Sequence, residues 1–273
     1  MKRVFLRSIF AFFFAFLVVE VSANSSVSGY SVPVVEVDYG AMGAAELWDM
    51  GNAAYANNDY LGAEKAYSAI LARDLHSYEL YYNLGNLHHR LGNVGQSLLY
   101  LYKAQKLNPS DRDVAHNIEV VRLGTVDEID ELPVLFVRRW ADWVSSRFSV
   151  VGWSVFSLVS LFFALAFFML YLFSSGLRFK RLGFSFGLLF VVAFAFATLY
   201  GVSARDEILN PSSAVVLSKR AVVRSAPDRS STEIFTLHEG TRVAVEREYG
   251  DWCEIRISDG KQGWVRLSSI GKI

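Results

Sequence analysis

Two long uncharged segments constrain the fold of this chain more than any other feature of its sequence. The first runs from Phe148 to Leu177 and the second from Leu182 to Ala204, and a short basic segment at 178–181 separates them. Each is longer than the roughly 20 apolar residues that an α-helix needs to cross a bilayer. Two such helices would leave a soluble fold without a polar face. We therefore expect a transmembrane hairpin, with helices at 149–175 and 182–204 and a turn at 176–181.

The composition agrees with a membrane protein and excludes some functions. Hydrophobic residues make up 52% of the chain and charged residues only 20%, which is too apolar for an ordinary soluble domain. The 27 Lys and Arg residues balance the 27 Asp and Glu residues, which argues against nucleic-acid binding because that function needs a basic surface. The single cysteine, Cys253, cannot form an intrachain disulfide. No Cys/His spacing is typical of a zinc site, and we expect neither a metal nor a cofactor.

The N-terminus has the pattern of an export signal. Basic residues among the first seven precede an uncharged run from Ser8 to Val19, and the small residues Val21 and Ala23 follow. The apolar run is too short to span a bilayer, and the small residues suit a signal peptidase. We predict a signal peptide at 1–23 and a flexible segment at 24–43, with an uncleaved anchor as the alternative.

This export signal decides the predicted orientation. Basic residues precede the hairpin in the same number as they occur in its turn, so the positive-inside rule gives no answer. If the chain is translocated from residue 24 onward, the first membrane helix runs inward and the second returns outward. The turn is then cytoplasmic, and the two soluble regions share the compartment outside the membrane.

An amphipathic helix is expected immediately before the hairpin, within a linker at 125–148. One helical stripe carries Phe136, Trp140, Trp143, Val144 and Phe148, and arginines lie on the other side. Tryptophan at headgroup depth with arginine near phosphates is typical of an interfacial helix. An ordinary packed amphipathic helix remains the alternative.

The first soluble region contains a repeat of 34 residues. Trp48-Asp49-Met50-Gly51 recurs as Tyr82-Asn83-Leu84-Gly85 and again as His116-Asn117-Ile118-Glu119. Small residues at 51 and 85 would let two antiparallel helices approach closely on either side of a tight turn. The pattern resembles the tetratricopeptide repeat, with two full units and a solvating helix in a domain at 44–124.

The resemblance implies a groove for a peptide or a partner protein, lined by the first helix of each unit. The residues that this groove would offer are Asn52, Tyr55, Asn83, Asn86, His89, Arg90 and Asn117. An asparagine side chain can hold a ligand backbone with a paired donor and acceptor. The alternative is that these asparagines only solvate a concave face.

After a linker at 205–213, the region 214–273 changes to short alternating runs separated by turn residues. This spacing is typical of a small antiparallel β-barrel. Leu237-His238-Glu239-Gly240-Thr241, with Gly250-Asp251-Trp252 and Gly263-Trp264-Val265, resembles a bacterial SH3 domain. Its aromatic candidates for a ligand surface are Phe235, Tyr249, Trp252 and Trp264. The alternative interpretation places the tryptophans in core or rim packing, and Cys253 is expected to fill a buried position.

The order of these parts resembles the BatE-type proteins of the Bacteroides aerotolerance group. The junction from Gly124 to Pro133 and then Arg139-Trp140 is similar to that family's, and the match extends over most of 44–273. The expected fold class is a multidomain membrane protein: an all-α tetratricopeptide-like repeat, a transmembrane helical hairpin and a small all-β SH3-like barrel. The resemblance implies a bacterial inner-membrane protein with both soluble domains in the periplasm. It also implies von Willebrand A-type membrane proteins and a MoxR-type ATPase as partners in oxidative-stress tolerance.

The expected function is that of a non-enzymatic scaffold, because no nucleophile elbow, phosphate loop or metal-binding helix is recognisable. Two binding modules tethered at one membrane face would raise the effective concentration for a partner that touches both. A peptidoglycan-binding, wall-sensing membrane protein is the alternative. The two hypotheses differ in the expected partner: another protein in the first, the cell wall in the second.

Overall fold

The computed structural model describes residues 38–129, 136–145 and 147–273. The predicted signal peptide and most of the segment at 24–43 lie outside the described residues. The elements that follow all belong to one unit, from Tyr39 to Ile273.

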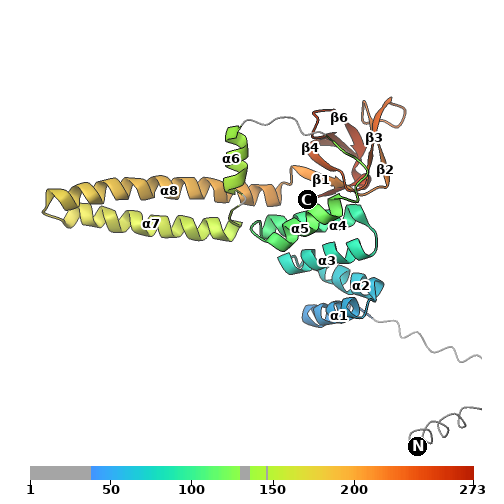
Figure 1. Cartoon of the computed structure of the whole chain (residues 1–273), viewed down its shortest axis with the longest axis horizontal. Helices are drawn as coiled ribbons and strands as arrows, with labels where there is room; N and C mark the ends of the chain where they lie inside the picture. The colour runs from blue at the N-terminus through green and yellow to red at the C-terminus, as the bar shows by residue number, and fades with distance from the viewer. Residues whose placement is uncertain (1–37, 130–135, 146) are drawn as a thin grey trace, which may run out of the picture. The chain divides into compact units, whose positions relative to one another are not determined.

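Paired antiparallel helices form the N-terminal part of this unit, as the repeat predicts (Figure 1). The helices are α1 (Ala44–Ala56), α2 (Tyr60–Leu71), α3 (Tyr78–Arg90), α4 (Val94–Leu107) and α5 (Arg112–Arg122). Each pair turns at an equivalent position with left-handed backbone, Asn58 at φ 62° and Gly92 at φ 76°. Asparagine and glycine adopt this conformation most readily, so the repeat extends to the turns.

The small residues at 51 and 85 allow the close approach that their spacing predicts. A Cβ on Gly51 would lie 2.5 Å from Cε1 of Tyr67, and one on Gly85 would lie 2.6 Å from Cγ of Leu101. Both opposing side chains are fully buried. Ser97 is also buried, and its hydroxyl donates a 2.7 Å hydrogen bond to the carbonyl of Gly85. In each helix pair, a bulky side chain of the second helix therefore packs directly against a glycine of the first.

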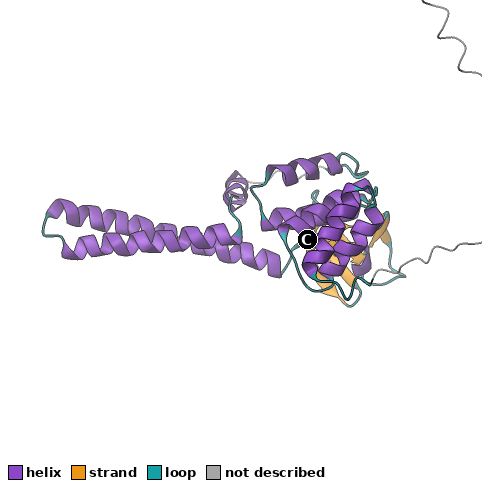
Figure 2. Ribbon diagram, turned by 90° about the horizontal axis from the view of Figure 1, so that it is seen from below, coloured by secondary structure: helices purple, strands orange, loops and turns teal. Residues whose placement is uncertain are grey.

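Two long apolar helices, α7 (Val150–Phe173) and α8 (Leu177–Leu209), lie side by side and antiparallel in both views (Figures 1 and 2). Their most apolar windows have mean hydropathies of 2.4 and 2.3, and only 17% and 11% of those windows are buried. Helices of this length and exposure are compatible with membrane anchoring. Ser157 and Thr198 share a 2.9 Å hydrogen bond between the two helices.

The ends of α8 correct two of the predicted boundaries. Arg178, Lys180 and Arg181 were expected in the turn but lie in the first turns of α8, because lysine and arginine are good helix formers. The connection between the helices is shorter, from Ser174 to Gly176. At the other end α8 continues to Leu209, through half of the expected linker at 205–213. Asn210 ends the helix just before Pro211, and the residue before a proline disfavours helical backbone.

The predicted amphipathic segment contains α6 (Phe136–Ser145). Phe136, Trp140 and Trp143 are exposed, by 80%, 56% and 54%. The guanidinium of Arg147 lies 4.1 Å from the ring centroid of Trp143. These exposed aromatic side chains suit the interfacial helix that the sequence predicts.

The C-terminal region forms a seven-stranded antiparallel sheet, shown as orange strands in Figure 2, with the order β3-β2-β6-β5-β4-β1-β7. The strands are β1 (Ser213–Val216), β2 (Arg220–Arg224), β3 (Glu233–His238), β4 (Arg242–Tyr249), β5 (Trp252–Arg256), β6 (Gln262–Arg266) and β7 (Ile270–Lys272). Cys253 is fully buried in its core, as expected, and burial raises the pKa of its thiol to about 11. The architecture is that of an SH3-like domain.

The sequence did not predict β1 and β7, which pair with each other. All four residues of β1 are buried, so the strand lacks the alternation of a half-exposed strand. Ala214 and Val216 face the core of the sheet, whereas Val215 belongs to a cluster with Leu98 and Leu99 of α4. The strand is therefore covered by its own sheet on one face and by the helical repeat on the other.

Candidate functional site

Asparagine pairs link neighbouring units of the repeat. Nδ2 of Asn83 donates to Oδ1 of Asn52 at 3.1 Å, and the hydroxyl of Tyr67 donates to the same oxygen at 2.7 Å. Oδ1 of Asn83 and Nδ2 of Asn52 have no hydrogen-bond partner among the described residues. The pair thus keeps one acceptor and one donor unused.

The same arrangement recurs one repeat further along. Nδ2 of Asn117 donates to Oδ1 of Asn86 at 2.8 Å, and it also approaches the hydroxyl of Tyr82 at 3.3 Å. Within the described part of the chain, Oδ1 of Asn117 and Nδ2 of Asn86 make no hydrogen bond. An unused donor beside an unused acceptor matches the C=O and N–H groups of an extended peptide.

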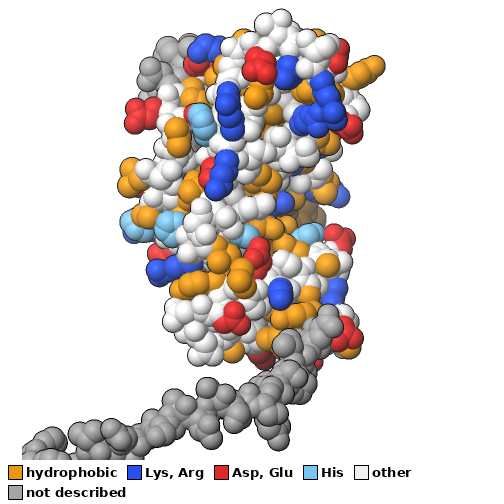
Figure 3. Space-filling model, turned by 90° about the vertical axis from the view of Figure 1, so that its right-hand side faces the viewer, with side chains coloured by type: hydrophobic (Ala, Val, Ile, Leu, Met, Phe, Trp, Pro, Cys, Tyr) orange, Lys and Arg blue, Asp and Glu red, His pale blue; other side chains and the backbone are white. Residues whose placement is uncertain are grey.

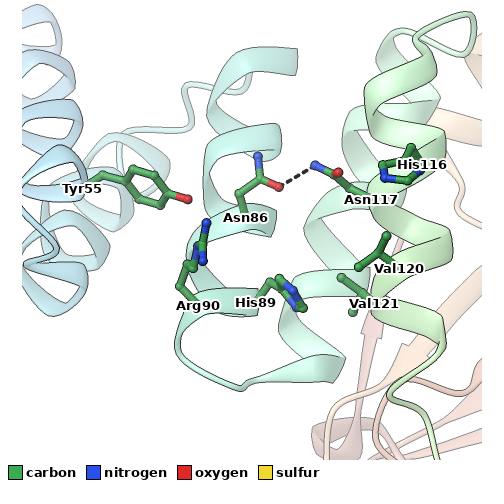
Figure 4. A pocket seen from close by; sticks show the side chains of 8 residues that line it. All are labelled: Tyr55, Asn86, His89, Arg90, His116, Asn117, Val120 and Val121. Atoms are coloured by element: carbon green, nitrogen blue, oxygen red, sulfur yellow. Dashed lines mark hydrogen bonds between the residues drawn. The ribbon is translucent and has the colours of Figure 1, made fainter.

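A cavity of about 380 Å³ adjoins this second pair, between α1, α3 and α5 (Figure 4). Its lining residues are Tyr55, Asn86, His89, Arg90, His116, Asn117, Val120 and Val121. Five of them belong to the groove that the sequence predicts: Tyr55, Asn86, His89, Arg90 and Asn117. The structure places Asn52 and Asn83 in the first asparagine pair, outside the lining of this cavity.

The cavity lining carries positive charge and includes no aspartate or glutamate within the described part of the chain. Arg90, His89 and His116 are all exposed at its edge. The Tyr55 side chain, as an acceptor for the guanidinium, raises the pKa of Arg90, so this side chain stays charged. Figure 3, by comparison, shows a face of the molecule on which basic and acidic side chains are interspersed.

Sequence reasoning missed His116, Val120 and Val121. For Val120 the signal was present, because residue 120 follows the predicted groove residue Asn86 by one repeat. The groove positions therefore extend along α5, from which the sequence predicted Asn117 alone.

The neighbouring His88 has a structural role. It is buried, its ring stacks 5.4 Å from that of Tyr100, and burial lowers its pKa although Glu64 acts in the opposite direction. His88 and His89 therefore point in different directions. Across the described residues, no group of three or more His, Cys, Asp and Glu side chains could hold a metal.

A second candidate surface lies on the outer face of β4, β5 and β6. Trp252 is paired with Arg266 across the strands, and the guanidinium lies 5.7 Å from the ring centroid. Trp264 is similarly placed under Arg247, at 5.9 Å. Tyr249 pairs with Trp252 on this face and is 70% exposed. These three aromatic residues and two arginines form the outer aromatic face.

Phe235 does not belong to the outer aromatic face, which corrects the predicted ligand surface. It pairs with Val223, whose side chain is fully buried, and it packs against the core of the sheet. Residues directly opposite each other in an antiparallel pair share one face, so Phe235 points inward. Trp252 and Trp264 are half-buried, and this partial burial is compatible with both predicted alternatives, ligand contact and rim packing.

The sheet and the repeat are joined by close backbone packing. A Cβ on Gly95 of α4 would lie 2.8 Å from the carbonyl oxygen of Val216 and 3.2 Å from Cα of Leu217. The C-terminal Ile273 is buried in the same cluster as Leu98 and Val215. Only glycine permits this approach, so the repeat does not end in solvent.

A carboxylate in the segment after α5 also binds the sheet, and we call the contact region between the sheet and the repeat the junction. Asp127 accepts hydrogen bonds from the backbone N–H of His238 at 2.7 Å, from Nδ1 of His238 at 2.6 Å and from the Thr241 hydroxyl at 2.5 Å. Burial raises the pKa of Asp127, but the hydrogen bonds from Thr241 and His238 together lower it below the ordinary value. The motif around His238 thus serves to hold the linker.

Lys106 joins a third part of the chain to the same junction. Its Nζ donates to the carbonyl oxygen of Glu207 at 3.0 Å, to Oε1 of Glu207 at 3.0 Å and to the carbonyl oxygen of Ile273 at 2.9 Å. An ammonium group has three donors, and all three are used. One cation at the end of α4 therefore binds the last turn of α8 and the end of the chain.

Comparison with known protein families identifies the two soluble parts. Residues 49–112 match the tetratricopeptide repeat. Residues 219–270 match the bacterial SH3 domain. No curated protein matches the chain. Both domains are binding modules, which supports a scaffold or binding role. The residues that pack against the repeat, in β1 and at Ile273, lie outside the SH3 match.

Proposed function

We propose that the chain is a non-enzymatic scaffold anchored in the bacterial inner membrane, with both soluble domains in the periplasm. The export signal predicted at 1–23 supports this orientation, because a hairpin after a translocated domain returns the chain to the same side. The exposed apolar surfaces of α7 and α8 support the anchor.

The proposed partners are proteins of an envelope-stress or aerotolerance complex. The resemblance to BatE-type proteins supports von Willebrand A-type membrane proteins and a MoxR-type ATPase complex as members. A domain beside the membrane meets other membrane-anchored proteins at high effective concentration, which favours membrane proteins as direct contacts.

The observation that carries the proposal is the second asparagine pair. Asn86 and Asn117 both line the cavity, hold each other through one hydrogen bond, and each keep one amide group without a partner among the described residues (Figure 4). Purely solvating asparagines would need no such mutual fixation. A fixed donor and acceptor lose little conformational entropy when a peptide backbone binds.

Site-specific photocrosslinking in native membranes tests this function. A photoreactive phenylalanine replaces Val120, which lines the cavity, or Leu61 of α2, which is 63% exposed and lies outside it. We expect specific protein adducts from position 120 that are lost when Asn86→Ala and Asn117→Ala are added, and no adducts from position 61. Equal yields from both positions would refute a partner-binding groove.

A second function, peptidoglycan binding, is favoured by the outer aromatic face. The half-buried tryptophan rings and the exposed ring of Tyr249 can stack on sugar rings. Arg266 can bind the carboxylates of stem peptides, whereas Arg247 already pairs with Glu254. The test is co-sedimentation of the full chain in detergent with isolated murein. We expect Trp252→Ala and Trp264→Ala to remove any binding and Leu61→Ala to spare it. If no wild-type protein sediments, the wall hypothesis is wrong.

A further inference from the structure

We propose that the α7–α8 hairpin binds anionic phospholipid at its open end, the end opposite the connection at 174–176, and that Arg147 and Arg205 receive the lipid phosphate. The inference rests on the proposed membrane anchoring and names the lipid that the anchor selects. The acyl chains of that lipid lie along the exposed apolar side chains of the two helices.

Contacts between the helices place both arginines at the open end. A Cβ on Gly201 of α8 would lie 3.3 Å from Cβ of Trp153 in α7. The helices run antiparallel, so each step back along α7 matches a step forward along α8 (Figure 2). Four steps bring Ser149, which caps α7, level with Arg205. Arg147 lies two residues before Ser149, so both cations border the apolar hairpin at one membrane surface.

The charges of both arginines are available to a ligand. Both side chains are exposed, and neither forms an ion pair with another residue in the described part of the chain. The acids beside Arg205 are engaged elsewhere. Asp206 accepts a 2.8 Å hydrogen bond from Asn210, and Glu207 pairs with Lys106 at 3.0 Å. The open end therefore attracts an anion.

The guanidinium of Arg147 is held in position by Trp143, whose ring centroid lies 4.1 Å away. Stacking uses the flat face of the guanidinium and leaves its in-plane N–H donors for the paired oxygens of a phosphate. Nε1 of Trp153 donates a 3.4 Å hydrogen bond to the carbonyl oxygen of Ser145, which connects the end of α6 to the first turn of α7. This arginine is therefore fixed where the membrane helix begins.

The surfaces next to the two arginines suit acyl chains and select the headgroup. Val151 and Val155 of α7 are 71% and 55% exposed, and Leu199 and Val202 of α8 are 71% and 62% exposed. In phosphatidylethanolamine, the ammonium of the headgroup competes with arginine for the phosphate. Phosphatidylglycerol carries no cation of its own, so its attraction to a basic surface is stronger.

Site-specific fluorescence quenching in bilayers tests the lipid site. The full chain in a Cys253→Ser background carries either Val155→Cys, near the open end, or Met169→Cys, near the connection, where Met169 is 50% exposed. Each cysteine is labelled with bimane, and the protein is reconstituted in phosphatidylcholine with brominated phosphatidylglycerol or brominated phosphatidylethanolamine. Bromine quenches bimane only at short range, so the two quenching curves give the relative affinity of the lipids beside each position.

We expect phosphatidylglycerol to be favoured at position 155 by about fivefold for each arginine. Arg147→Gln combined with Arg205→Gln should abolish this preference at position 155 and leave the result at position 169 unchanged. The matched control is Arg229→Gln, an exposed arginine in the loop between β2 and β3, which should keep the preference. All three arginines are exposed, so the variants are expected to fold.

Two outcomes overturn the inference and can be told apart. Equal quenching by the two lipids at position 155, or a preference that survives in the double variant, would show that the arginines select no lipid, while the membrane anchor stands. If neither lipid quenches bimane at either position, the hairpin does not lie in the bilayer, and the proposed anchoring fails together with the lipid site.

Discussion

Replacing Asp127 with alanine should release the sheet from the repeat. The carboxylate accepts three hydrogen bonds, from the backbone and ring of His238 and from Thr241. Its side chain is only 14% exposed, whereas that of His238 is 37% exposed. Water can therefore replace the bond to the imidazole more readily than the bond to the backbone N–H.

The magnitude follows from these three bonds. A hydrogen bond to a charged group contributes about 1.5–3 kcal/mol, and bonds within one network do not add independently. Because the ring of His238 remains accessible to water, we expect a loss of about 3 kcal/mol in the free energy that holds this junction closed. Asp127→Asn retains one carbonyl oxygen, so it should lose roughly half as much.

Hydrogen exchange of the full chain in nanodiscs measures this loss. A tenfold change in an equilibrium corresponds to about 1.4 kcal/mol, so amides at 233–241 should exchange about a hundredfold faster in Asp127→Ala. The matched control is Asp228→Ala, which removes a carboxylate bonded only within its own loop, to Ser230. If Asp127→Ala exchanges no faster at 233–241 than this control, the junction does not depend on Asp127.

Three further predictions concern the same junction. Because the folded pKa of Asp127 is lowered, its contribution to the stability of the junction is complete above the unfolded pKa of about 3.9 and is lost as the pH falls through the folded pKa. Hydrogen exchange at 233–241 should therefore accelerate below about pH 4 in wild type. An equal acceleration in Asp127→Ala would contradict this origin. Gly95→Ala should destabilise the full chain by about 1–2 kcal/mol in denaturant titrations, since the clash with β1 outweighs the better helix propensity. Gly43→Ala should not, because no atom lies within 4 Å of the added Cβ, and equal unfolding midpoints for the two variants would disprove the close packing. Lys106→Met should accelerate exchange of the last turn of α8 by roughly tenfold, because backbone and carboxylate acceptors lose their donor, and unchanged exchange there would show that this cation does not hold the helix end.

Local patterns in the sequence predicted the separate parts of this fold correctly. The repeat of small and bulky residues around Gly51 and Gly85 implied paired helices, and both glycines lie against bulky side chains. Alternating residues implied the central strands β2 to β6. These features depend on contacts within one unit or between adjacent strands, so a short window of sequence contains them.

The junction between the parts could not be predicted in this way. Val215 is buried because a helix more than a hundred positions earlier covers it, and its short apolar strand gives no alternation. Asp127 resembles any other acid in a polar linker until His238 lies beside it. The candidate site shows the same limit: spacing placed Asn86 and Asn117 in one groove, but their mutual hydrogen bond depends on how two repeat units stack.

Accessibility of introduced thiols in spheroplasts tests the proposed anchoring most directly. In a Cys253→Ser background, single cysteines replace Ser175, between α7 and α8, or Ser258, in an exposed turn of the sheet. A membrane-impermeant maleimide should label position 258 in intact spheroplasts and position 175 only after lysis. Labelling of position 175 before lysis, with position 258 protected, would place the two binding domains in the cytoplasm and contradict the account.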